Sequence, residues 1–178
     1  MIYRLPGGGI VLNFKLAYEL YQEFFGNPLG LRKRPRRKKF RRPLLLDVYE
    51  TIYLAEERGL KVFYKDKELS VEELKSLYSY DEAAYRVYKL LRNKGYIVRS
   101  GMRFGANFLV YIKGPDVEHA PYAVIVARKA AGLDLVRVSR LTHSVGKEAL
   151  LAVVEGDDVR IYRVRRFKEL KRILDGIY

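Results

Sequence analysis

The sequence predicts an α+β protein with a small N-terminal α/β domain, followed by a C-terminal domain with helices on a mixed β-sheet. Two observations support this fold class. The chain has 178 residues, 49% of them hydrophobic, which is enough to bury a sizeable core in one large or two small domains. Its pattern also changes near residue 80, from alternating helices and strands to one helix followed by a series of strands. We therefore expect domains at 1–80 and 81–178.

The first domain alternates short strands with capped helices. Residues 7–14 (GGGIVLNF) indicate a strand, and apolar residues at helical spacing follow until the turn at 26–28. A helix is predicted to open at 44–47 (LLLD) and to end at Gly59. A strand at 61–64 and the N-cap signature Ser-Val-Glu-Glu at 70–73 complete the expected elements of this domain.

The second domain starts with a helix whose apolar face carries Ala84, Val87, Tyr88 and Leu91 and which ends at Gly95. Runs typical of strands follow, separated by turns at Gly101, 114–115 and 155–158. The expected strands are 96–99, 108–112, 122–127, 135–138, 148–154 and 159–164.

Positive charge dominates the composition. The formal net charge is +14, and the segment 32–43 (RKRPRRKKFRRP) holds nine basic residues and no acidic one. Such a segment, with prolines at positions 35 and 43, is expected to form a loop or arm inserted in the first domain. The excess of positive charge predicts a polyanionic partner, most plainly a nucleic acid.

Several classes are disfavoured by the residues that are missing. The chain has no cysteine, which excludes disulfides, a thiolate zinc site and a cysteine nucleophile. No apolar run approaches the roughly 18 residues of a membrane span, so no membrane partner is expected. The first ten residues, MIYRLPGGGI, do not form a signal-peptide pattern. We therefore expect a cytoplasmic protein.

A metal-dependent nuclease is a weaker alternative. Nucleases with a central sheet often hold a metal ion with a PD…(D/E)xK pattern. Pro115 and Asp116 match its first half, but Ala127 stands where the acid before Lys129 is needed. The match at 73–75 (ELK) lies in the other domain. We expect no metal and no cofactor.

Acid–base chemistry without a metal has three candidate residues. Tyr111 ends the strand FLVYI, His119 precedes the next predicted strand, and Lys147 lies in RLTHSVGK. If the strands are neighbours, the tyrosine and the histidine can meet at one sheet end. Spacing alone does not separate these roles from ordinary ones, because a strand tyrosine is usually packed, a lone histidine often lies in a turn, and a lysine is normally solvated.

A longer ordered set of residues runs through the second domain: Tyr88, Leu91, Arg92, Gly95, Tyr96, Val98, Gly101, Arg103, Phe104, Gly105, Phe108, Tyr111, His119, Ala120, Arg140, Ser144, Val145 and Lys147. This set resembles the C-terminal, nuclease-like domain of the archaeal tRNA-splicing endonuclease (tRNA-intron endonuclease) family. The resemblance is strong over 85–165 and looser over the first domain. Two positions depart from the family pattern: Arg103 replaces a lysine, and Asn107 replaces an aspartate, which removes a charge.

The resemblance implies metal-independent cleavage of precursor tRNA at the bulge-helix-bulge motifs that flank its intron. The products would carry 2′,3′-cyclic phosphate and 5′-hydroxyl ends. Tyr111 would be the general base, His119 the general acid and Lys147 the cation that stabilises the transition state. A non-catalytic RNA-binding or structural subunit of such a complex is the second alternative.

The resemblance also implies residues that hold RNA and contact other subunits. Arg140, with Arg163 or Arg165, would clamp a bulged base, and we expect Lys38 and Lys39 of the basic segment to contact RNA. The acidic turn with Glu155, Asp157 and Asp158 would lie at a subunit interface. The assembly would be a homotetramer or an α2β2 heterotetramer with a second endonuclease subunit.

Overall fold

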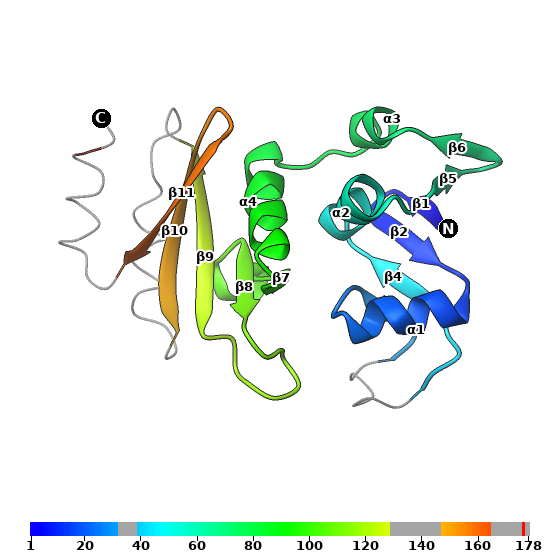
Figure 1. Cartoon of the computed structure of the whole chain (residues 1–178), viewed down its shortest axis with the longest axis horizontal. Coiled ribbons are helices and arrows are strands. Elements are labelled where there is room, and N and C mark those ends of the chain that lie inside the picture. Colours follow the sequence, from blue (N-terminus) through cyan, green and yellow to red (C-terminus); the bar gives the residue numbers. More distant parts are fainter. Residues whose placement is uncertain (32–38, 129–146, 165–175, 177–178) are drawn as a thin grey trace. The chain divides into compact units, whose positions relative to one another are not determined.

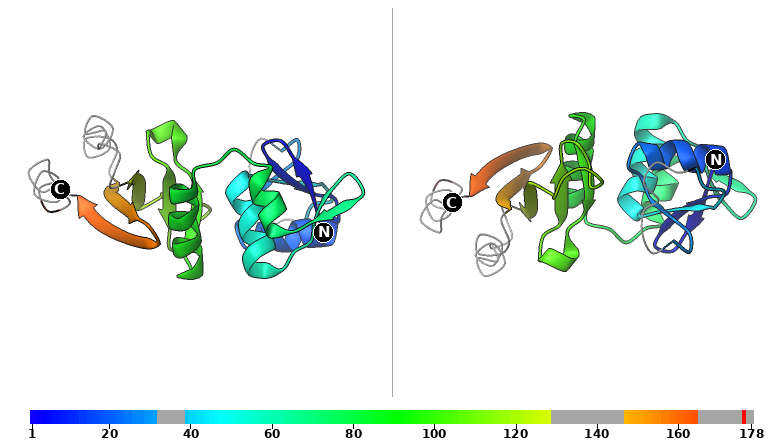
Figure 2. Two further views of the ribbon diagram at one scale, coloured as in Figure 1. Left: turned by 90° about the horizontal axis from the view of Figure 1, so that it is seen from above. Right: turned by 90° about the horizontal axis from the view of Figure 1, so that it is seen from below.

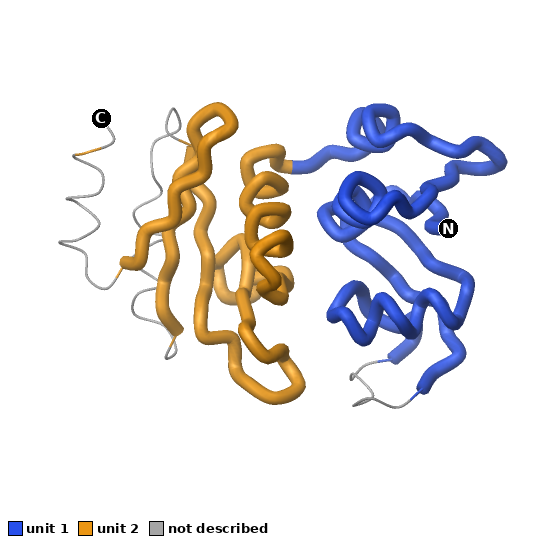
Figure 3. Tube along the Cα trace, in the orientation of Figure 1, with its two compact units in different colours: residues 1–80 blue, residues 81–178 orange. Residues whose placement is uncertain are grey.

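The protein divides into two compact units, residues 1–80 and 81–178, coloured separately in Figure 3. A computed structural model describes residues 1–31, 39–128, 147–164 and 176.

The first unit is a mixed sheet with helices (Figure 1). Within its described residues the strand order is β3-β4-β2-β1-β5-β6, and only β1 and β5 pair in parallel. Helices α1 and α2 pack against this sheet, and α3 packs on α2. The elements are β1 Ile2–Leu5, β2 Gly8–Val11, α1 Phe14–Gln22, β3 Asn27–Pro28, β4 Leu44–Leu46, α2 Val48–Arg58, β5 Val62–Tyr64, β6 Lys67–Leu69 and α3 Val71–Ser76.

Helix α2 is fixed at both ends by its own sequence. Asp47 accepts from the backbone N–H of Glu50, whose carboxylate in turn accepts from the N–H of Asp47, which is a capping box. The same carboxylate is buried and accepts from the N–H of Gly26 at 2.9 Å. Gly59 ends the helix in the left-handed region, with φ of 61°. Glu50 therefore ties the start of α2 to the turn before β3.

The helix predicted to open at residue 44 begins later. Leu44, Leu45 and Leu46 form strand β4, with buried, half-buried and buried side chains in turn, and α2 begins only after Asp47. A short apolar run fits a buried strand as well as a helix. Pairing with β2 and β3 on either side decides in favour of the strand.

The end of the basic segment is attached to the first unit. The ring of Phe40 lies edge-on to the rings of Tyr18 and Tyr21 on α1, with centroids 5.7 and 5.2 Å apart. The N–H of Leu29 donates to the carbonyl of Pro43 at 2.9 Å. The segment thus leaves and re-enters the fold at neighbouring points, while 32–38 lie outside the described residues.

The second unit is a five-stranded mixed sheet with one described α-helix. In the described residues the strand order is β11-β10-β9-β8-β7, and β9 and β10 are the one parallel pair. The predicted α+β class is confirmed, whereas the strand expected at 135–138 lies outside the described residues. The elements are α4 Glu82–Asn93, β7 Ile97–Ser100, η1 Met102–Phe104, β8 Phe108–Tyr111, β9 Tyr122–Arg128, β10 Glu148–Glu155 and β11 Asp158–Val164.

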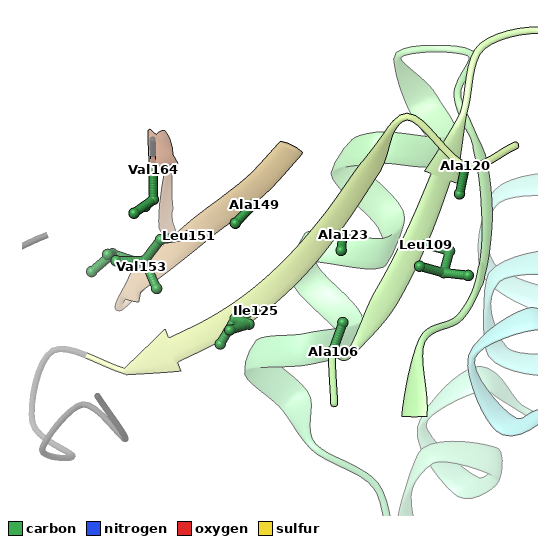
Figure 4. Packing of buried hydrophobic residues seen from close by; sticks show 9 residues of the cluster. All are labelled: Ala106, Leu109, Ala120, Ala123, Ile125, Ala149, Leu151, Val153 and Val164. Carbon is green, nitrogen blue, oxygen red and sulfur yellow. The ribbon is translucent and has the colours of Figure 1, made fainter. Parts of the chain in front are cut away.

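The second sheet has buried residues on both faces. Helix α4 lies along one face (Figure 2), where the ring of Tyr88 packs against Phe108 with centroids 5.9 Å apart. The other face carries small and branched apolar residues from neighbouring strands and from the turns beside them, shown in Figure 4. We call this set the apolar cluster: Ala106, Leu109, Ala120, Ala123, Ile125, Ala149, Leu151, Val153 and Val164.

Among the described residues, no helix combines the length and the apolar character that crossing a lipid bilayer requires.

We predict that Glu50→Ala lowers the free energy of unfolding of the first unit by about 2 kcal/mol or more, because it removes a cap and leaves the buried Gly26 N–H without its acceptor. Hydrogen exchange of the α2 amides measures this loss. Glu57→Ala, an exposed glutamate of the same helix, is the control and should change the value by about 0.5 kcal/mol or less. Equal exchange in the two variants would contradict the role given to Glu50.

Candidate active site

The strand register brings three chain segments to one edge of the second sheet. Tyr122, the first residue of β9, pairs with both Val110 in β8 and Glu148 in β10. Because β8 is antiparallel and β10 parallel to β9, Tyr111 and Lys147 lie on the two sides of the chain that enters β9. Their backbones are two strand spacings apart, about 10 Å. Two long side chains can span that distance toward a common phosphate.

His119 reaches the same edge from the 112–121 loop, which joins β8 to β9. It lies two residues before Pro121, and it is exposed. The chain after it is held in place, since Ala120 is buried in the apolar cluster and the N–H of Glu148 donates to the carbonyl of Pro121 at 2.9 Å. The three predicted catalytic residues therefore come from three segments that meet at one sheet edge.

Tyr111 and Lys147 are both associated with the face of the sheet opposite α4. Tyr111 is half-buried and packs against the apolar cluster on that face. The Nζ atom of Lys147 lies 5.3 Å from the centre of the Phe104 ring, a cation–π distance. Phe104 ends η1, two residues before Ala106 of the same cluster. Tyr111 comes two residues after Leu109 and Lys147 two residues before Ala149, so both fall on the face of the apolar cluster by strand alternation. The Phe104 ring contacts the ammonium group of Lys147.

Glu118, which sequence reasoning did not single out, closes the 112–121 loop. Its Oε1 atom accepts from the backbone N–H groups of Ile112 and Lys113, both at 2.6 Å, and of Gly114 at 3.3 Å. The hydrogen bond from the Lys113 N–H, helped by those from Gly114 and Ile112, lowers the pKa of this carboxyl from its ordinary value of 4.5. Burial raises the pKa, but by less than the Lys113 bond lowers it. Gly114 takes φ of 110°, which glycine adopts readily.

Asn107, which stands where the family pattern has an aspartate, makes a hydrogen bond at the start of β8. Its Oδ1 atom accepts from the N–H of Val126 at 3.0 Å, and its own N–H donates to the carbonyl of Val124 at 2.9 Å. The bond from Val126 needs only an oxygen acceptor, which a side-chain amide provides without a charge. The start of β8 is therefore fixed to β9.

Of the predicted RNA-binding residues, Arg163 and Lys39 lie in the part of the chain that the structure describes. Arg163 is exposed, forms an ion pair with Glu148, and pairs in β11 with Leu150 of β10. Its neighbours Tyr162 and Val164 pack in or against the apolar cluster, so by strand alternation Arg163 lies on the other face. Lys39 is exposed beside Phe40. Lys38, Arg140 and Arg165 lie outside the described residues.

The acidic turn between β10 and β11 is bonded to α4 of the same chain. Arg86 donates to Asp157 at 2.5 Å and to the carbonyl of Gly156, and it forms an ion pair with Glu82 at 3.6 Å. The side chain of Asp157 is nevertheless fully exposed. The turn is therefore held in one place while its carboxylate stays accessible.

The described residues contain no group of three or more His, Cys, Asp or Glu side chains that could hold a metal ion. The three predicted catalytic residues at this sheet edge carry a phenol, an imidazole and an ammonium group. A phenol and an imidazole can exchange protons with a substrate, and an ammonium can stabilise an anionic transition state. This combination suits transfer of a phosphoryl group to a hydroxyl nucleophile.

Comparisons with known proteins find similar sequences along most of the chain. Residues 82–162 match the family model described as tRNA intron endonuclease, catalytic C-terminal domain, and residues 4–75 match tRNA intron endonuclease, N-terminal domain. The chain is 43% identical to a tRNA-splicing endonuclease of Pyrobaculum aerophilum over 157 residues, which are 82% of this chain and 85% of the relative. It is 40% identical to one of Hyperthermus butylicus over 161 residues, 85% of this chain and 88% of the relative.

We predict that the Glu118 carboxyl titrates with a midpoint below 4.5. Since the pKa of Glu118 is lowered in the folded chain, its ionised carboxylate stabilises the fold at pH values above 4.5. This stabilisation is lost as the pH falls through the pKa of the folded state. A carbon-13 NMR titration of the side-chain carboxyl, assigned with Glu118→Gln, measures the midpoint. A midpoint at or above 4.5 would show that the loop is not closed by these bonds.

Proposed function

The chain belongs to the tRNA intron endonuclease family, and from that premise we propose that it is an RNA endonuclease that removes introns from precursor tRNA. It cuts at bulge-helix-bulge motifs and needs no metal ion. The cuts leave 2′,3′-cyclic phosphate and 5′-hydroxyl ends. The observation that carries this proposal is the double pairing of Tyr122, with Val110 and with Glu148, which sets Tyr111 and Lys147 at one sheet edge.

The reaction uses the ribose 2′-hydroxyl as its nucleophile. Tyr111, as the phenolate, takes the proton from this hydroxyl while the 2′-oxygen bonds to phosphorus. His119, as the imidazolium, gives a proton to the 5′-oxygen as the phosphorus–oxygen bond breaks. Lys147 stabilises the negative charge on the non-bridging oxygens.

The base role requires an ionised phenol. An ordinary phenol has a pKa of about 10, so only a small fraction is ionised at neutral pH. A nearby ammonium group favours the phenolate, and Lys147 supplies one from the other side of the chain that enters β9. The same cation thus serves both the ground-state base and the transition state.

Removing an intron requires two cuts in one RNA, and therefore two active sites at a fixed separation. We propose that the chain works as a homotetramer or as the catalytic subunit of an α2β2 heterotetramer. Glu155, Asp157 and Asp158 of the turn between β10 and β11 lie at a subunit interface in this assembly. Arg86 holds that turn in place for the contact.

RNA is held by cationic side chains outside the reacting centre. Arg140, together with Arg163 or Arg165, clamps a bulged base between guanidinium planes. Lys38 and Lys39, in the basic segment, bind backbone phosphates without sequence preference.

We predict that Tyr111→Phe, His119→Ala and Lys147→Ala each slow cleavage of a bulge-helix-bulge RNA in EDTA by about a hundredfold or more, because each removes a proton carrier or the stabilising charge. Single-turnover rates with saturating enzyme measure the chemical step. The matched controls Tyr96→Phe and Lys94→Ala should stay within about threefold of the unmodified protein.

Other outcomes of this experiment separate the alternatives. Rates within about tenfold for the tyrosine and histidine variants would reject their roles. Tight binding without cleavage, with the chain alone or with its second subunit, would indicate a non-catalytic RNA-binding subunit. Cleavage that needs magnesium would indicate a metal-dependent nuclease.

We predict that deleting residues 32–42 weakens RNA binding and reduces its dependence on salt concentration. The segment carries nine of the basic residues of the chain, and each phosphate that it neutralises releases a counterion. Binding constants measured between about 50 and 200 mM salt give the slope. An unchanged slope would mean that the segment serves another partner.

A further inference from the structure

The three proposed catalytic residues are not held equally firmly. Tyr111 lies in β8 and pairs with Ile97 of β7, and Lys147 directly precedes β10. His119 instead lies in the 112–121 loop, outside every described strand, and it is exposed. A general acid must nevertheless stay within hydrogen-bond reach of the atom that it protonates. Buried Ala120 anchors the chain after His119, so the loop still needs a means of fixing the chain before it.

The contacts of the preceding residue, Glu118, meet this need. Its carboxylate accepts three hydrogen bonds from consecutive backbone N–H groups, those of Ile112, Lys113 and Gly114, directly after Tyr111. Its own N–H donates to the carbonyl of Gly114 at 3.1 Å. One end of the loop is thereby bonded to the other, next to both Tyr111 and His119.

We propose that Glu118 is a positioning residue that holds His119 at the 5′-oxygen of the scissile phosphate. This inference rests on the proposed function. Because Glu118 precedes His119 in the chain, fixing its backbone and side chain fixes the point from which the imidazole extends. Bonds to an ionised acceptor are stronger than neutral ones, so a carboxylate suits this role better than an amide.

Glu118 is not itself the proton donor. Its Oε1 atom accepts from three N–H groups, an arrangement that favours the carboxylate form, whereas a general acid must carry a proton. In the proposed step the 2′-oxygen bonds to phosphorus as the bond from phosphorus to the 5′-oxygen breaks. The 2′-proton passes to Tyr111, and His119 gives its proton to the 5′-oxygen. Glu118 neither gains nor loses a proton.

The test uses a substrate that does not need a general acid. A bulge-helix-bulge RNA with sulfur in place of the bridging 5′-oxygen at one junction releases a thiolate, which leaves without protonation because a thiol has a pKa of about 8.5. The other junction in the same RNA keeps its oxygen and serves as an internal reference. Single-turnover rates at both junctions are measured for Glu118→Ala, Glu118→Gln and His119→Ala.

We expect Glu118→Ala to slow the oxygen junction by about tenfold to a hundredfold and the sulfur junction by no more than about threefold. Glu118→Gln should show the same selectivity with a smaller loss, since its amide oxygen still accepts hydrogen bonds. His119→Ala should show the largest selective loss. Asp116→Asn removes an exposed carboxylate two residues away in the same loop and should match the unmodified protein at both junctions.

Two failures are distinguishable. If His119→Ala is equally slow at both junctions, the general-acid role of His119 in the proposed function is wrong. If His119→Ala is rescued by sulfur while both Glu118 variants are slow at both junctions, or fast at both, the inference about Glu118 is wrong and the proposed function stands. Melting temperatures show whether Glu118→Ala folds, and Glu118→Gln provides the test if it does not.

Discussion

The parallel pairing of β9 and β10 is the constraint on which the candidate site depends. The other described pairings in this sheet are antiparallel, so a parallel strand beside β9 places the start of β10 at the same edge as the start of β9. An antiparallel β10 would begin at the far end of β9, about 20 Å away, given seven residues at 3.3 Å each. Lys147 and Tyr111 would then be at opposite edges.

The site combines rigid and exposed parts for a reason that follows from its substrate. In the proposed reaction an RNA backbone reaches Tyr111, His119 and Lys147, so this edge of the sheet has to stay open. A loop residue such as His119 is accessible there but has less support than a residue within a strand. The strand ladders hold Tyr111, the Phe104 ring orients Lys147, and the Glu118 carboxylate closes the loop. Each group is thus fixed by a different interaction.

Sequence reasoning succeeded where local chemistry decides structure. Ser70 begins α3 through a capping box that the sequence signals. Strands β1 and β6 were missed because each has only three or four residues, although each forms a hairpin with the next or preceding strand. The roles of Tyr111, His119 and Lys147 stay predictions. Sequence reasoning did not single out Glu118. The signal that could have found it is a glutamate placed four residues after the glycine of a Gly-Pro turn, where its carboxylate can close the loop.

The largest concentration of positive charge, in residues 32–43, lies between two strands of the first sheet and not within them. Residues 29 and 43 are joined by a backbone hydrogen bond, and Pro28 pairs with Leu44 just inside that bond. The segment between them therefore starts and ends at neighbouring points of the sheet. The entropy cost of closing such a loop changes only slowly with its length. In the proposed function the basic residues of this segment bind RNA, whereas Phe40 of the same segment packs on Tyr18 and Tyr21 and contributes to the stability of the first unit.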